Sequence, residues 1–323
     1  MNGIAAEAPA RGDLTRRAAI ASMSVALLLL VLKGVALWQS GSVALLGSLA
    51  DSTLDLIASL VTLLGVRWAA MPADHDHRFG HGKAEALAAL FQVTLISMAA
   101  VGIAWASLHR LGSVQPVGAP ELGIGVSIVA ILLSLALVAY QKSIIARTGS
   151  LAISTDNLHY QSDLLLNLSV IVALVLDQHM GVRGVDPLFG LGIAAWLGWG
   201  AWRSAGEAVD HLMDKEWSVE ERRRFLEVAL RHPELRGIHD MRTRTSGPER
   251  FVQFHVSVDP DMTVRRAHEV MEQIEDMLGR EFPGVEILIH PDPYGYDIEE
   301  RAEDPLRGAE ARKLLDREMH RRR

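Results

Sequence analysis

The stretch DNLHYQSDLLLN, residues 156–167, decides the fold. It leads into residues 164–176, a run of 13 residues without Asp, Glu, Lys or Arg. Such a run spans only about 20 Å as a helix, whereas the apolar core of a bilayer is about 30 Å thick. The helix can cross only if it begins near Ile153, which places His159 and Asp163 inside the membrane. The stretch therefore predicts a membrane helix with two ionisable side chains at membrane depth.

Charge is distributed unevenly along the 323 residues. Residues 1–213 carry 12 Lys+Arg and 14 Asp+Glu, whereas the remaining 110 residues carry 20 and 25. The first part is membrane-like, and the last third has the composition of a soluble domain. The net charge of −7 gives no reason to expect a nucleic-acid partner. Because the chain has no cysteine, disulfides and thiolate metal ligands are excluded.

Six segments are long enough to cross a bilayer as helices. They are residues 18–38, 43–66, 86–108, 122–141, 153–176 and 187–213. The basic residues of the short connections lie mostly on one side. That side carries Arg11, Arg16, Arg17, Arg67, Arg78, Lys83, Lys142, Arg147, Arg203 and Lys215, and the other carries Arg110 and Arg183. We therefore expect a multi-pass protein of the cytoplasmic (inner) membrane with both termini in the cytoplasm.

The pattern predicts four regions along the chain. Residues 1–13 form an N-terminal cytoplasmic segment, 14–213 an all-α six-span membrane bundle, 214–295 a small cytoplasmic α+β domain, and 296–323 a charged mobile tail. In the α+β domain we expect helices over residues 218–231 and 263–282. Strands are expected over 237–247, 250–259 and 285–290, with SGPER as the turn between the first two.

Two pairs of ionisable residues lie within the predicted spans. Asp51 and Asp55 are four residues apart on the second span, and His159 and Asp163 are four apart on the fifth. Each pair therefore shares one face of its helix. An ionised carboxylate in hydrocarbon costs several kcal/mol, and the single Lys33 of the first span cannot balance three of them. A divalent cation can.

Three carboxylates and one imidazole suit tetrahedral Zn²⁺. Ca²⁺ and Mg²⁺ prefer shells made of oxygen alone, while Co²⁺, Ni²⁺, Cd²⁺, Fe²⁺ and Mn²⁺ stay open as alternatives. Metal ligands must be deprotonated, so such a site can exchange metal for protons. The alternative is that these residues only join helices by hydrogen bonds. Two i,i+4 pairs on separate spans favour a functional site.

Further candidate ligands lie outside the spans. In MPADHDHRFGHGKAEAL, residues 71–87, His77 and His81 can share a face, with Asp74 just before them. On spacing alone, a metal site and a chance cluster are both open. The soluble domain has histidines on two strands, on a helix and after the last strand. They are His239, His255, His268 and His290, with Asp292 in the same HPD motif as the last. Because no P-loop, HExxH or GxSxG motif occurs, nothing indicates an enzyme.

Four stretches together resemble the cation diffusion facilitator family, in particular its bacterial zinc/proton antiporter branch. They are GSLADSTLD (47–55), PADHDHRFGHGKAEALAAL (72–90), DNLHYQSD (156–163) and HDMRTRTSGPERFVQFH (239–255). The resemblance covers about residues 14–293. It implies an inverted-V or parallel homodimer of six-span protomers, with a cytoplasmic domain like a metallochaperone.

The resemblance also implies three metal sites. It implies a transport site at Asp51, Asp55, His159 and Asp163, a loop site at Asp74, His77 and His81, and a cytoplasmic site using His239, His255, His268, His290 and Asp292. It implies that Lys83 and Asp214 pair between protomers. In this interpretation His75 is an extra histidine that binds nothing.

The expected function is export of cytoplasmic Zn²⁺, with Cd²⁺ as a second ion, in exchange for protons. Zn²⁺ is then both the substrate and a structural or regulatory ion of the cytoplasmic sites. Two alternatives stay open. One is a membrane zinc sensor or scaffold that binds without flux, and the other is a proton-coupled carrier of an organic substrate or of another divalent ion such as Fe²⁺, Mn²⁺, Co²⁺ or Ni²⁺.

Overall fold

A computed structural model describes residues 7–40, 43–111, 121–180 and 185–295. These residues form two compact units. The first is Pro9–Leu212, and the second begins at Met213. The tail expected over residues 296–323 lies outside the described residues.

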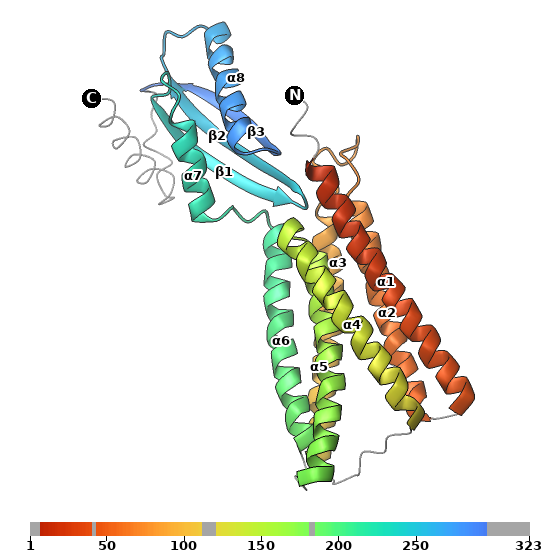
Figure 1. The fold of residues 1–323 in the computed structure, drawn as a ribbon. Coiled ribbons are helices and arrows are strands. Elements are labelled where there is room, and N and C mark those ends of the chain that lie inside the picture. Colours follow the sequence, from red (N-terminus) through yellow and green to blue (C-terminus); the bar gives the residue numbers. More distant parts are fainter. Residues whose placement is uncertain (1–6, 41–42, 112–120, 181–184, 296–323) are drawn as a thin grey trace. The chain divides into compact units, whose positions relative to one another are not determined.

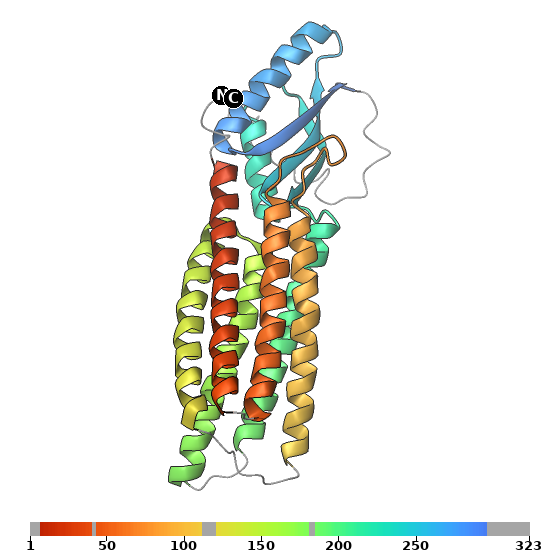
Figure 2. The same cartoon turned by 90° about the vertical axis from the view of Figure 1, so that its right-hand side faces the viewer.

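The first unit consists of long helices that run side by side (Figures 1 and 2). They are α1 (Glu7–Ser40), α2 (Val43–Ala69), α3 (Ala84–Leu111), α4 (Glu121–Thr148), α5 (Leu151–Met180) and α6 (Val185–Leu212). The chain reverses direction at each connection, so both ends of the bundle collect helix termini from several segments. We name the end where α1 passes into α2 the Ser40 end, and the end where α6 finishes the Leu212 end.

Apolar side chains cover the outside of this bundle. Among the described residues, four helices contain a stretch long and apolar enough to cross a membrane. These stretches are Arg11–Gln39, Ser48–Ala69, Ala84–Leu111 and Ile128–Thr148. Helices α5 and α6 have 30 and 28 residues, lengths of about 45 and 42 Å. Large side chains such as Met98, Trp105 and Leu132 are exposed on the bundle, as expected when lipid is the solvent. The predicted membrane fold is confirmed.

Two helices begin earlier than the sequence pattern indicated. Helix α1 starts at Glu7, so residues 7–13 of the predicted N-terminal segment are helical and continue into the first span. Ala, Glu and Arg are good helix formers, and Pro9 is tolerated because it lies in the first turn of the helix, where a backbone N–H has no helical partner. Helix α5 starts at Leu151, two residues before Ile153, near which it was expected to begin, and two residues after Gly149, which has φ +66°. A glycine adopts this left-handed conformation without strain, which allows α4 and α5 to join through a very short turn.

Small residues let neighbouring helices approach closely within the bundle. A Cβ atom added at Gly65 would lie 2.4 Å from Cβ of Ala88, so α2 and α3 are in contact through their backbones there. A Cβ atom at Gly190 would lie 2.1 Å from Oγ of Ser107, where α6 meets α3. Such contacts are typical of membrane helices, which associate by close packing.

The second unit is a three-stranded sheet with two helices (Figure 1). Its elements are α7 (Val219–Ala229), β1 (Gly237–Ser246), β2 (Glu249–Val258), α8 (Val264–Glu281) and β3 (Val285–Pro293). The strand order is β1-β2-β3, with β1 antiparallel and β3 parallel to β2. Phe225 of α7, Phe254 of β2 and Ile274 of α8 are fully buried in a common core. The small α+β domain predicted from the sequence is confirmed.

Candidate metal centres

The first candidate centre joins α2 to α5 inside the bundle. Nε2 of His159 lies 2.9 Å from Oδ1 of Asp55 and 3.8 Å from Oδ2 of Asp163. One potential ligand atom from each of these three residues falls within 4.8 Å of the others. All three side chains are largely buried, with 14% of His159, 11% of Asp55 and 23% of Asp163 exposed. This cluster of two carboxylates and one imidazole can hold a divalent cation.

A cavity of about 330 Å³ leads to these carboxylates. Asp51, Asp55 and Asp163 line it together with Lys33 of α1. Asp51 is therefore in the same cavity, one helical turn before Asp55, although it is not part of the three-residue cluster. Nζ of Lys33 on α1 donates a hydrogen bond to Oγ of Ser52 on α2 at 2.6 Å. This bond holds the Lys33 ammonium group against α2, beside the acidic residues.

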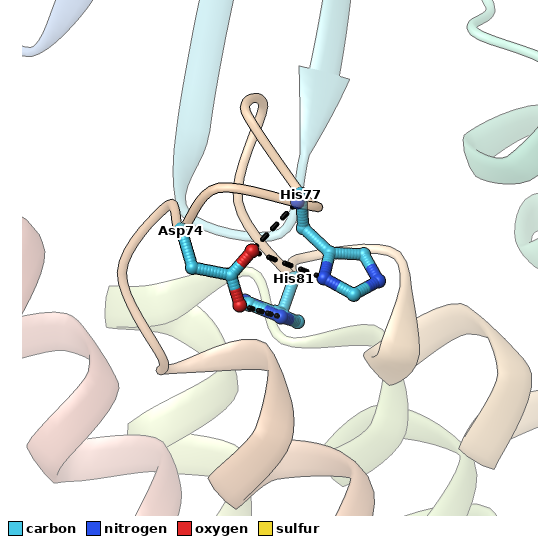
Figure 3. A group of neighbouring side chains, drawn as sticks. All are labelled: Asp74, His77 and His81. Carbon is cyan, nitrogen blue, oxygen red and sulfur yellow. Dashed lines mark hydrogen bonds and ion pairs between the residues drawn. The ribbon is translucent and has the colours of Figure 1, made fainter.

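The second centre lies in the connection between α2 and α3 (Figure 3). Oδ1 of Asp74 accepts the backbone N–H of His77 at 2.6 Å and lies 3.2 Å from Nδ1 of the same residue. Oδ2 of Asp74 lies 3.3 Å from Nε2 of His81. The backbone hydrogen bond from His77 is the main cause that holds the pKa of Asp74 below its usual value.

His81 differs from its neighbours in this loop because it is buried. Its Nδ1 has no hydrogen-bond partner among the described residues. The turn that brings it to Asp74 passes through Gly80 with φ +73°, a conformation that favours glycine. Asp74, His77 and His81 each offer one ligand atom within 4.8 Å of the others. His75 is exposed and does not belong to this group. The loop therefore presents a carboxylate and two imidazoles that can hold a metal ion.

The third centre is built by strand register in the second unit. His239 of β1 pairs with His255 of β2, which pairs with His290 of β3, so the three histidines lie side by side across the sheet. Asp292 follows two residues after His290 on the same face. Its Oδ2 lies 3.0 Å from Nε2 of His239 and 2.8 Å from Nδ1 of His255. Its Oδ1 lies 3.3 Å from Nε2 of His290.

The electrostatics of this centre favour an ionised carboxylate. Burial opposes the charge of Asp292, but hydrogen bonds from His255 and His239 outweigh it and hold the pKa of Asp292 below its usual value. His239, His255 and Asp292 form the group with ligand atoms within 4.8 Å, and His290 adjoins it. His268 is elsewhere in the described chain, exposed on α8 and 3.5 Å from Glu272. One protomer does not bring it to the cluster, so its role across a dimer stays a prediction.

Comparison with known proteins identifies the family to which this chain belongs. The cation efflux transmembrane domain matches residues 19–213, and the cytoplasmic domain of cation efflux proteins matches residues 217–294. The chain belongs to the cation efflux family. The cation-efflux pump FieF of Cronobacter sakazakii is 42% identical over 282 residues, which cover 87% of this chain and 94% of that protein. FieF of Pectobacterium atrosepticum is 43% identical over 285 residues, covering 88% and 95%.

A solved structure of CzrB in its zinc form is also similar, with 38% identity, a TM-score of 0.22, and coverage of 24% of this chain and 88% of that one. The cation efflux family is a family of transporters, and the protein is thus a multi-pass membrane transporter of metal cations. Its match to the family's cytoplasmic dimer domain implies a homodimer. Lys83 donates to the carbonyl of Leu212 at 3.2 Å, and its predicted pairing with Asp214 of a partner stays a prediction.

Sequence reasoning missed one group of buried polar residues in this cation efflux protein. Asp156, Gln92 and Gln141 are at most 1% exposed, and both glutamines donate hydrogen bonds to Asp156. A signal was present, because Asp156 is a third ionisable residue in the quoted stretch, beside His159 and Asp163, and lies one helical turn before His159. Gln141 ends one predicted apolar segment and Gln92 lies within another, and neither position alone shows which helix the side chain contacts, so their burial could not be inferred.

Proposed function

We propose that this chain exports Zn²⁺, with Cd²⁺ as a second cargo, across the bacterial inner membrane in exchange for protons. The observation that carries the proposal is the cluster of Asp55, His159 and Asp163 at a cavity within the membrane bundle. Asp51 lines the same cavity and is the fourth donor of the proposed transport site. The mixed set of carboxylates and imidazole supports Zn²⁺ over Mg²⁺ and Ca²⁺.

Exchange for protons follows from the chemistry of the donors. Carboxylates and imidazole bind metal only when deprotonated, so protons entering the cavity compete with the ion for the same atoms. The charge of the site also favours either a metal ion or protons, but not both at once, because several carboxylates at membrane depth need one of the two to balance their charge. In the proposed cycle both termini are cytoplasmic, metal enters from that side, and protons displace it on the other.

The loop and cytoplasmic centres act as zinc-binding sites outside the transport path in this proposal. Asp74 with His77 and His81, and Asp292 with its histidines, supply the donors for resident zinc ions. Zinc at these centres would shift the transporter between states through different affinity for each state. A resident ion would also fix the strands or loop that carry its ligands.

The test is zinc flux in proteoliposomes that contain a zinc-sensitive dye and carry a pH gradient. Wild-type protein should move Zn²⁺ when protons flow the opposite way. Asp55→Asn keeps the size of the side chain and should reduce flux at least about tenfold, since even the loss of a residue that only hydrogen-bonds to a metal ligand costs roughly 10–100-fold. Glu207→Gln is the matched control, because Glu207 is a carboxylate on α6 that pairs with Arg203 outside the cavity. Binding without flux in the wild type would instead support a sensor.

A further inference from the structure

A fully buried carboxylate joins four helices next to the proposed transport site. Oδ2 of Asp156 on α5 accepts Oγ of Ser22 on α1 at 2.5 Å and Nε2 of Gln141 on α4 at 2.7 Å. Oδ1 accepts Nε2 of Gln92 on α3 at 2.8 Å. Asp156, Ser22 and Gln141 are 0% exposed and Gln92 is 1% exposed. We name these four residues the polar layer.

The orientation of the donors in the polar layer is fixed by a second set of bonds. Oε1 of Gln141 accepts Nδ2 of Asn157 at 2.9 Å, so the amide nitrogen of Gln141 must face Asp156. That nitrogen also lies 2.8 Å from Oγ of Ser22. All three donors to the carboxylate are neutral, and together they replace the water that a buried carboxylate loses. Because each donor comes from a different helix, the carboxylate links α5 to α1, α3 and α4 at one level.

The polar layer and the cavity lie on opposite sides of the metal cluster. Asp156 precedes His159 by three residues, about 4.5 Å toward the Leu212 end of α5. The cavity extends the other way, because its lining includes Arg110 near the end of α3 and Gly190 near the beginning of α6. Within the described bundle, none of the four layer residues lines this cavity.

We infer that Asp156 is a positioning residue that closes the transport site toward the Leu212 end. Its hydrogen bonds hold α5 against three other helices, so that the site opens only to the Ser40 end in this conformation. Access from the Leu212 end requires the donors to leave the carboxylate. The inference deepens the proposed transport function and rests on it, but the closure itself can be measured without any metal flux.

The absence of cysteine from the sequence allows a direct test of accessibility. Thr62 of α2 is 0% exposed and lies seven residues beyond Asp55, about 10 Å toward the Leu212 end. Ser134 of α4 lines the cavity. Thr62→Cys and Ser134→Cys each give a full-length protein with a single cysteine, which is studied in nanodiscs. The rate at which a small cationic methanethiosulfonate modifies this cysteine reports water access to the Leu212 side at residue 62 and to the cavity at residue 134.

We expect Ser134→Cys to react at least about ten times faster than Thr62→Cys. Adding Asp156→Asn removes one acceptor oxygen and should raise the rate at Thr62→Cys about tenfold, without raising the rate at Ser134→Cys. Ser22→Ala removes one donor and should produce a smaller increase at the same position. Ser97→Ala is its control, because the hydroxyl of Ser97 donates to the carbonyl of Val93 within α3.

An unchanged rate at Thr62→Cys in both layer variants would overturn the inference. Equal acceleration at both cysteines would also overturn it, because general loosening of the bundle affects both sides. If Asp156→Asn does not yield a folded dimer, Ser22→Ala and Ser97→Ala decide instead. The inference then requires that Ser22→Ala, and not Ser97→Ala, raises the labelling rate at Thr62→Cys without raising it at Ser134→Cys. If the wild type shows no zinc flux but Thr62→Cys and Ser134→Cys still differ in labelling rate as expected, export is refuted. The positioning role of Asp156 then still holds.

Discussion

Nε2 of His159 lies 2.9 Å from Oδ1 of Asp55, although 104 residues separate them in the chain. The contact brings the fifth helix to the second at the depth where both helices carry their acidic residues. Without a cation, the imidazole and the carboxylate satisfy each other by this hydrogen bond. In the proposed transport site, the same two atoms become ligands of the cation. Under that proposal, the pair explains how a charged site can persist in the membrane both before and after metal binds.

His159 supplies the only nitrogen donor of the proposed transport site, so it should set metal selectivity. His159→Asp would give an all-carboxylate site, which suits harder ions. We expect the flux of Mn²⁺ relative to Zn²⁺ to rise at least about tenfold, measured across a metal panel in proteoliposomes. His109→Asp changes a histidine at the Ser40 end of α3 and should leave the ratio unchanged. An unchanged ratio in His159→Asp would show that selectivity resides elsewhere.

The loop centre should account for one zinc ion per protomer. His81→Ala removes a buried imidazole whose Nε2 lies 3.3 Å from Asp74. We expect the zinc stoichiometry to fall by one per protomer in equilibrium dialysis. His75→Ala, an exposed neighbour outside the cluster, is the matched control and should bind as the wild type does. Equal stoichiometry in both variants would contradict the loop site.

Spacing within a single helix predicted which side chains share a face at the proposed transport site. His159 and Asp163, like Asp51 and Asp55, share a helix face because they are four residues apart, and that geometry needs no knowledge of the fold. Apolar length likewise predicted the membrane helices. The sequence could not predict which atoms meet across helices, because the contact of His159 with Asp55 depends on the rotation of each helix.

Contacts between residues far apart in the sequence account for other features that the sequence did not predict. The alignment of His239, His255 and His290 depends on a strand register that links β3 to β2 in parallel, across the whole of α8. The polar layer needs four helices to meet at Asp156, and a single polar residue in an apolar segment does not show which helices will meet there. The start of α1 at Glu7 was missed because a search for apolar segments does not detect a helix that extends beyond the membrane.

Asp292 should be essential for zinc at the cytoplasmic centre. Its two oxygens contact three histidines, so Asp292→Asn removes the shared anionic donor. We expect zinc affinity of the second unit to fall at least about tenfold in titration calorimetry. Asp261→Asn changes an exposed carboxylate just before α8 and serves as the control. Unchanged affinity in Asp292→Asn would contradict a role for this carboxylate as a ligand.

Glu221 should link the stability of the second unit to pH. It belongs to a capping box with Ser218 at the start of α7 and lies 2.9 Å from Nη2 of Arg250. Burial opposes its charge, but the hydrogen bond from Ser218 and the charge of Arg250 outweigh that effect and lower the pKa of Glu221. A carboxylate with a lowered pKa stabilises the folded state above its unfolded pKa of about 4.3. This stabilisation is lost as the pH falls through the lower, folded pKa.

Replacing Glu221 should therefore matter at neutral pH and not in acid. Because this side chain is half exposed, we expect Glu221→Gln to lower the free energy of unfolding at pH 7 by less than about 1 kcal/mol. The difference from wild type should shrink as the pH falls below about 4. Thermal unfolding of residues 213–295 is the measurement, since this unit has its own core. Glu220→Gln changes the neighbouring first-turn carboxylate and should cost less, and a difference that grew in acid would refute the linkage.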